Sequence, residues 1–298
     1  RNADFDFAVV DLHELAEFIG DDILHFDGVY SCCAVWVNGR FAGYSQGANN
    51  VAEFDISALA RPGKNQLSVK VYRWCDGSYL EAQDMWRLSG IHRDVYLYAT
   101  PRTFVRDHYI TVADQSADGT AGNLDVAVEL DNRDGRNADK TVAVELYDAK
   151  RNLVAKTSQR VQFKDKSKKI NLTLPGLKNL TPWNAENPYL YTVVLTQSDN
   201  GMEEMAFSTK YGFRNIAVVD SADHHYYTIN GKRIFFKGAD IHDTHPLYGR
   251  YVDNETMLAD IRLMKQANLN TVRTSHYPYA EEFYDLCDRE GILVMDET

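Results

Sequence analysis

Polar and apolar residues alternate with a period of two over most of residues 21–112, a pattern typical of half-buried β-strands. The Asn38-Gly39 pair lies between two β-prone arms and predicts a two-residue hairpin turn. We therefore predict a jelly-roll-like β-sandwich over residues 1–112. Its start is expected to be incomplete, because the weakly amphipathic segment 12–20 fits no strand. The expected strands are 35–44 as a hairpin, 53–57, 65–74 and 93–99.

A second β-rich stretch covers residues 113–220. Its apolar runs are separated by polar turns at the spacing of an immunoglobulin-like β-sandwich. The Cys…Trp…Cys pattern of antibody domains is missing, so the prediction concerns the architecture alone. The expected strands are 124–130, 140–148, 170–174, 189–197 and 205–214.

The hydrophobic period changes after about residue 225. Residues 253–270 have apolar side chains at helical spacing, with Asp253 in the N-cap position. Strands that alternate with helices predict a parallel sheet with right-handed crossovers. Residues 221–298 therefore predict the first βα units of a (β/α)₈ TIM barrel, which needs about 250 residues when complete. A strand, a second helix and a further strand are expected over 271–276, 280–290 and 292–297.

Composition narrows the classes of partner and the compartment. The net charge of −11 argues against nucleic acid, because phosphate binding needs clustered Lys and Arg. The chain has no run of 18 apolar residues, which a transmembrane helix would need. No membrane partner is therefore expected. Four cysteines without metal or disulfide spacing favour a reducing, cytoplasmic location. The polar, acidic opening holds no signal peptide, and a periplasmic location is the alternative if a leader precedes it.

The segment 74–97 is too polar and too aromatic for an ordinary strand connection. It places Asp76 between Trp74 and Tyr79. One interpretation is a surface loop whose aromatic side chains pack against a neighbouring domain. The other is a loop that reaches across to a site on that domain.

Two further polar groups follow predicted strands. Arg273 and His276 lie at the end of an apolar strand, where parallel α/β barrels place their chemistry. An arginine that faces into a barrel needs an anionic partner. His242 and His245 are three residues apart, which could indicate a metal pair, but no third ligand is evident.

The segment 74–97 (WCDGSYLEAQDMWRLSGIHRDVYL) and the segment 270–295 (NTVRTSHYPYAEEFYDLCDREGILVM) resemble glycoside hydrolase family 2, the β-galactosidase and β-glucuronidase group. The SGIHRDV run and the His245-Pro246 pair favour β-galactosidase. The resemblance covers about residues 22–298. It implies a sugar-binding first sandwich and a catalytic barrel.

The resemblance also implies roles for single residues. Asp76 is expected to bind a sodium ion and the sugar's 6-hydroxyl. Carboxylate oxygens are hard ligands, which suit such an ion. His242 is expected to hydrogen-bond the galactosyl ring, and His276 to support the transition state. Arg273 is expected to pair with the nucleophilic glutamate.

Retaining glycosidases of this kind need two carboxylates about 5 Å apart. The resemblance places both glutamates, and the magnesium ligands, beyond Thr298. Adjacent Asp296 and Glu297 would point apart and could not form the pair. We therefore expect the full-length protein to hydrolyse terminal β-D-galactosides with retention, with a homo-oligomer as a possible assembly, and this chain to be inactive alone. The alternatives are a truncated carbohydrate-binding or scaffold protein and a β-glucuronidase-type member of the family.

Overall fold

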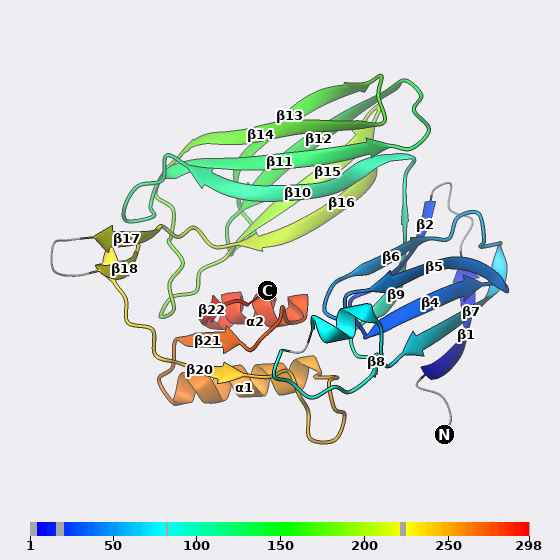
Figure 1. Cartoon of the computed structure of the whole chain (residues 1–298). Coiled ribbons are helices and arrows are strands. Elements are labelled where there is room, and N and C mark those ends of the chain that lie inside the picture. Colours follow the sequence, from blue (N-terminus) through cyan, green and yellow to red (C-terminus); the bar gives the residue numbers. More distant parts are fainter. Residues whose placement is uncertain (1–4, 16–20, 82, 221–224, 298) are drawn as a thin grey trace.

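The computed structural model describes residues 5–15, 21–81, 83–220 and 225–297 (Figure 1). Two β-sandwiches are followed by a smaller part that contains strands and helices. The second sandwich, green to yellow in Figure 1, lies over the orange and red C-terminal part, and the blue first sandwich lies beside it. The fold is mainly β, as the sequence predicts. Among the described residues, no helix is long and apolar enough to cross a membrane.

The first sandwich has two main sheets, of order β1-β7-β4-β5 and β6-β2-β9, and a small β3-β8 pair. The predicted hairpin is confirmed as β4–β5. It turns at Asn38 and Gly39, whose φ angles of 51° and 76° fit a two-residue turn. Fully buried side chains such as Val35 and Phe26 fill the space between the sheets. The strands are β1 (Phe5–Leu15), β2 (Asp21–Phe26), β3 (Val29–Tyr30), β4 (Cys32–Val37), β5 (Arg40–Gln46), β6 (Ala52–Asp55), β7 (Gly63–Tyr72), β8 (Gly90–Ile91) and β9 (Val95–Thr100).

The expectation that segment 12–20 fits no strand is wrong for its first four residues, which belong to β1. Strand β1 pairs antiparallel with β7, from Phe5 opposite Tyr72 to Leu15 opposite Gly63. The pairing is regular from Phe5 to Leu12, and the register shifts only between Leu12 and Leu15, where the strand overlaps the amphipathic segment. Residues 16–20, the rest of the amphipathic segment, lie outside the described residues.

The second sandwich packs the sheet β10-β11-β14 against the sheet β13-β12-β15-β16. The expected boundary at residues 112 and 113 falls inside β10, which pairs with β11 and so belongs to this sandwich. Strand β13 was not predicted, because most of its side chains are exposed and show no apolar alternation. The strands are β10 (Thr103–Ala113), β11 (Gly122–Asn132), β12 (Ala138–Tyr147), β13 (Leu153–Phe163), β14 (Ser167–Leu177), β15 (Tyr191–Asp199) and β16 (Met202–Tyr211).

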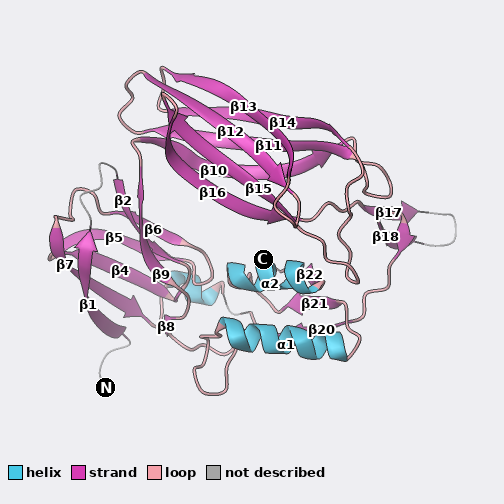
Figure 2. Ribbon diagram, turned by 180° about the vertical axis from the view of Figure 1, so that it is seen from behind, coloured by secondary structure: helices cyan, strands magenta, loops and turns pink. Residues whose placement is uncertain are grey.

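The C-terminal part contains the predicted parallel sheet, of order β20-β21-β22. Figure 2 shows helices α1 and α2 close to these strands. Helix α1 begins as predicted, since the Asp253 side chain accepts a hydrogen bond from the Thr256 amide at 2.8 Å. An antiparallel group, β17-β18-β19, precedes the parallel sheet. The elements are β17 (Ile216–Asp220), β18 (His225–Ile229), β19 (Lys232–Arg233), β20 (Gly238–Ile241), α1 (Asn254–Gln266), β21 (Thr271–Thr274), α2 (Glu281–Glu290) and β22 (Leu293–Met295).

The end of α2 joins the C-terminal part to the second sandwich. Gly291 ends the helix with a φ of 78°, and a Cβ at this position would lie 2.4 Å from the Ala185 carbonyl oxygen. The Lys265 ammonium donates to that oxygen at 2.7 Å, and the Trp183 indole donates to the Asp288 carbonyl at 2.8 Å. The glycine therefore allows two backbones to approach closely at this interface.

We expect Gly291→Ala to lower the free energy of unfolding by more than the cost of a left-handed alanine, which is roughly 1–2 kcal/mol. The Cβ contact with Ala185 should add about 1–3 kcal/mol of overpacking. Thermal unfolding of the variant and of Gly201→Ala measures the difference. Gly201 has a φ of 83° and open space around its Cβ, so it isolates the backbone cost. Equal losses in the two variants would contradict the contact.

Candidate functional site

Polar side chains gather at the carboxyl ends of the three parallel strands. Asp240 in β20 lies opposite Arg273 in β21. His242 follows β20, His276 follows β21, and Glu297 follows β22. Because the strands run in parallel, these five side chains are carried to a single edge of the sheet.

The Arg273 guanidinium lies between two carboxylates. Its Nε donates to Glu297 Oε1 at 2.7 Å, and its Nη1 lies 3.3 Å from Asp240 Oδ1. The hydrogen bond from His276, together with Arg273, lowers the pKa of the Glu297 carboxyl. Arg273 therefore has the anionic partner that its position predicts. That partner is Glu297, whose role was not predicted. Its position at the end of a predicted strand could have indicated that role.

The same carboxylate holds the His276 ring. Nδ1 of His276 lies 2.7 Å from Glu297 Oε2, and an ionised carboxylate can only accept, so this nitrogen carries a proton. The His242 ring lies 5.5 Å from the His276 ring, with an interplanar angle of 78°. The structure thus brings three of the four predicted site residues together: His242, Arg273 and His276.

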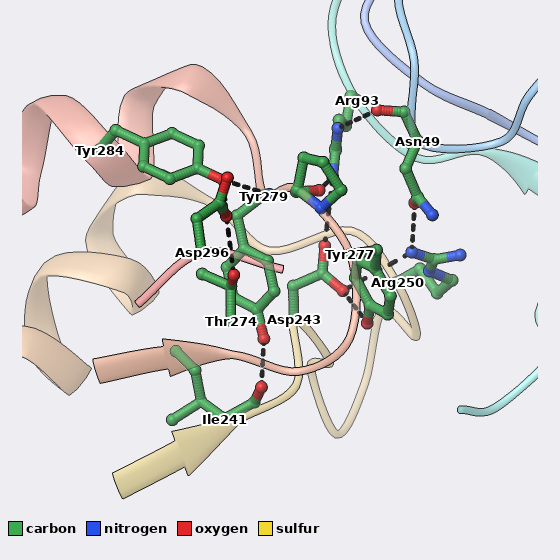
Figure 3. A network of polar contacts seen from close by, with 11 residues as sticks. Asn49, Arg93, Ile241, Asp243, Arg250, Thr274, Tyr277, Tyr279, Tyr284 and Asp296 are labelled. Carbon is green, nitrogen blue, oxygen red and sulfur yellow. Dashed lines mark hydrogen bonds and ion pairs between the residues drawn. The ribbon is translucent and has the colours of Figure 1, made fainter. Parts of the chain in front are cut away.

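The side chains of Asp296 and Glu297 diverge, as their adjacent positions predict. Asp296 Oδ1 accepts hydrogen bonds from Thr274 Oγ1 at 2.8 Å and from the Tyr284 hydroxyl at 2.7 Å (Figure 3). Glu297 turns instead to Arg273 and His276. The two carboxylates have separate partners and do not form a catalytic pair.

The fourth predicted residue, Asp76, begins a short 3₁₀ helix, Asp76–Tyr79, and is exposed. Among the described contacts, none joins Asp76 to either His242 or His276. The segment that carries it does reach the C-terminal part, because Met85 packs against the apolar cluster of that part. The expectation that Asp76 binds the same sugar as the two histidines stays a prediction.

His245 stabilises the turn that follows β20. Its Nδ1 accepts hydrogen bonds from the Leu247 amide at 3.1 Å and the Tyr248 amide at 3.2 Å. The ring stacks on the Tyr248 ring at 4.5 Å. Within the ranges that the structure describes, no group of three or more His, Cys, Asp or Glu residues could hold a metal ion. The metal-pair interpretation of His242 and His245 therefore gains no support.

A buried ionic group lies directly behind the histidines and was also missed. The Asp243 carboxylate contacts the guanidinium groups of Arg93 and Arg250, each at 3.7 Å, and accepts a hydrogen bond from Tyr277 (Figure 3). The first of these arginines belongs to the first sandwich. Segment 74–97, which the sequence suggests could contact a neighbouring domain, carries Arg93. No local pattern, however, predicted the contact between Arg93 and Asp243.

The neighbouring His92 is buried with a relative exposure of 6%, and neither ring nitrogen has a hydrogen-bond partner within the described chain. Burial, followed by the charges of Arg250 and Arg93, holds the pKa of this imidazole well below its usual range. The folded protein therefore keeps His92 neutral, whereas the unfolded chain takes up a proton below about pH 6.5. Stability is lost as the pH falls through that value, because the unfolded state binds more protons.

We expect His92→Phe to reduce the loss of stability on acidification. Below about pH 6.5 the difference from the unsubstituted chain should approach 1.4 kcal/mol per pH unit. Thermal unfolding between pH 7.5 and 5.5 measures it. Tyr109→Phe, at an exposed position in β10, serves as the control and should leave the slope unchanged. Parallel pH profiles for His92→Phe and the unsubstituted chain would contradict the assignment.

Models of one protein family match all three parts of the chain. The model of the glycosyl hydrolases family 2 sugar binding domain matches residues 9–101, and the model of glycosyl hydrolases family 2 matches residues 103–214. The model of the glycosyl hydrolases family 2 TIM barrel domain matches residues 221–298. The chain is 40% identical over 275 residues to a beta-galactosidase of Halalkalibacterium halodurans and 39% identical over 280 residues to one of Priestia megaterium. Each alignment covers 92% of this chain and 26% of the relative, so the chain spans about a quarter of these proteins.

Solved structures agree with this assignment. A glycosyl hydrolase family 2 member from Bacteroides cellulosilyticus superimposes with a TM-score of 0.89 at 25% identity, over 99% of this chain and 40% of that one. A β-glucuronidase from Ruminococcus gnavus superimposes with a TM-score of 0.82 at 26% identity, over 98% of this chain and 49% of that one. The three family matches, which follow one another along nearly the whole sequence, show that this chain belongs to glycosyl hydrolase family 2.

Proposed function

We propose that the protein containing this chain is a retaining glycosidase that hydrolyses terminal β-D-galactosides. The observation that carries the proposal is the strand-end group in which Glu297 holds Arg273 and His276 beside His242. The relatives named beta-galactosidase, at about 40% identity over 92% of the chain, support galactosides as the substrate class.

In this proposal the chain binds and orients the sugar. Glu297 engages Nδ1 of His276, so Nε2 is left available for a hydrogen bond with a sugar hydroxyl. His242 offers a second imidazole 5.5 Å away, measured between ring centroids. Arg273 supplies positive charge at the strand end, which favours the ionised form of an adjacent nucleophilic carboxyl.

The carboxylates of the reaction come from elsewhere in the barrel. A retaining mechanism needs a nucleophile and an acid/base about 5 Å apart. Glu297 is engaged by Arg273 and His276, and Asp296 is engaged by Thr274 and Tyr284. We therefore assign both catalytic glutamates to parts of the protein outside this chain.

We further propose Asp76 as the sodium ligand that this chain supplies. Its carboxylate is exposed and takes part in none of the described side-chain hydrogen bonds, so its oxygens are available to a hard cation. The charge of a bound sodium ion would hold a sugar hydroxyl through its oxygen. We assign magnesium no ligand among residues 1–298.

A protein that carries this chain and a complete barrel tests the proposal. We expect it to hydrolyse nitrophenyl β-D-galactoside at least about 10²-fold more efficiently, in kcat/KM, than the matching glucuronide. Discrimination of this size is reached when a site hydrogen-bonds one substrate and leaves polar groups unpaired with the other. Proton NMR should show β-galactose as the first product.

Two outcomes would favour the alternatives. Preference for the glucuronide would support a β-glucuronidase, which the Ruminococcus gnavus structure makes a specific second candidate. Sugar binding without hydrolysis of either substrate would support a carbohydrate-binding or scaffold protein.

A further inference from the structure

The acid next to His242 is the centre of a buried ionic network. The Asp243 side chain has a relative exposure of 10%, and the side chains of Arg93 and Arg250 have 7% and 2%. Each guanidinium lies 3.7 Å from one of the two carboxylate oxygens of Asp243. Two buried cations therefore share one anion directly behind the strand ends.

The network ties the first sandwich to the C-terminal part. Arg93, in the segment before β9, donates to the Asn49 carbonyl at 3.2 Å and to the Pro278 carbonyl at 2.5 Å (Figure 3). Arg250 donates to the Asn49 side-chain oxygen at 2.8 Å. Its guanidinium also lies over the rings of Tyr30 and Tyr277, at 5.2 and 4.7 Å from the centroids.

A hydrogen bond within this network links the two segments that carry the histidines. The Tyr277 hydroxyl donates to Asp243 Oδ1 (Figure 3). Asp243 directly follows His242, and Tyr277 directly follows His276. A second bond joins the same segments, because the Tyr279 hydroxyl donates to the Ile241 carbonyl at 2.5 Å. The two histidine rings, whose centroids are 5.5 Å apart, therefore lie on segments that these two bonds join directly.

The buried charges of this link depend on the Asp243 carboxylate. Burial raises the pKa of the Asp243 carboxyl, and Arg250, Tyr277 and Arg93 act against that rise. Among the described residues, Arg93 Nε and Arg250 Nη1 have no hydrogen-bond partner, so the network holds no spare acceptor. Removing the carboxylate would leave two cations buried without an anion, which proteins tolerate poorly.

We propose that Asp243 is a positioning residue that sets the separation of His242 and His276, and that Arg93 makes the first sandwich part of this arrangement. The effect on catalysis rests on the proposed function. The geometric claim does not, because it concerns the histidine rings of this chain. A shift of about 1 Å in a group that orients substrate can cost 10²-fold in rate, so a small movement of either ring should be measurable.

Tyr277→Phe tests the link with the smallest change. It removes the hydroxyl and keeps the ring that packs against Arg250. In the 298-residue chain we expect the imidazole ¹⁵N resonances of both His242 and His276 to shift, while those of His108, in the second sandwich, stay in place. Tyr109→Phe, which removes an exposed hydroxyl, is the matched control. Unchanged resonances for both histidines in Tyr277→Phe would overturn the proposal.

Kinetics of the complete-barrel protein give the second readout. We expect Tyr277→Phe to lower kcat/KM for nitrophenyl galactoside about tenfold, and Asp243→Asn and Arg93→Met about 10²-fold. Arg106→Met, at an exposed arginine bonded to Glu53, should leave kcat/KM unchanged. Shifted histidine resonances in a protein without hydrolase activity would refute the proposed function alone. Full activity in Tyr277→Phe and Arg93→Met would refute the positioning roles alone.

Discussion

Replacement of Arg273 by Met is expected to lower kcat/KM for nitrophenyl galactoside about 10²–10³-fold in the complete-barrel protein. Losses of this size follow the removal of one oriented donor at a reacting centre. The substitution also takes away the cation that holds Glu297, which then no longer fixes the His276 ring. One change therefore disturbs the charge and the geometry of the site together.

Two further variants separate these effects. Arg273→Lys keeps the charge and loses the planar fork that contacts Glu297 and Asp240, so it should recover only part of the activity. Arg262→Met, at an exposed position in α1, should retain full activity. Wild-type kinetics in Arg273→Met would show that the strand-end arginine takes no part in the reaction.

The 298-residue chain by itself is expected to hydrolyse nitrophenyl galactoside at least about 10⁴-fold more slowly than the complete-barrel protein. General acid–base catalysis alone contributes about 10²–10⁴-fold, and the covalent route also needs a nucleophile. The carboxylates at the strand ends already have cationic partners. Glu297 and Asp240 both contact Arg273, whereas Asp243 is buried between Arg93 and Arg250.

Side-by-side assays of equal molar amounts of the two proteins measure this difference. Glu297→Gln in the isolated chain is the decisive control, because Glu297 lies at a strand end in contact with His276 and Arg273. Robust turnover by the isolated chain that disappears in Glu297→Gln would place a catalytic carboxylate within these residues and contradict the assignment.

The parallel sheet could be predicted from the sequence because its signals are local. Helical spacing and an N-cap at Asp253 defined α1, and the change of period defined the strands on either side. The meeting of Arg273 and His276 with His242 followed from one topological rule, since parallel strands end at the same edge. These predictions needed no knowledge of contacts between distant segments.

The features that sequence reasoning missed depend on distant contacts. Strand β1 is recognisable through its partner β7, about 60 residues later, and not through its own alternation. Arg93 and Pro278 are separated by 185 positions, and their hydrogen bond exists only because two domains pack together. Glu297 was considered as half of a carboxylate pair. Its role toward Arg273 and His276 required the register of β21 against β22.

The crystal structure of the complete-barrel protein with a thio-β-galactoside bound tests the account most directly. We expect a sugar at the carboxyl ends of β20, β21 and β22, with hydroxyl oxygens within about 3.2 Å of ring nitrogens of His242 and His276. Glu297 should still bridge Arg273 and His276 in that complex. A sugar bound only on a sandwich face, with both histidine rings beyond hydrogen-bond reach, would contradict it.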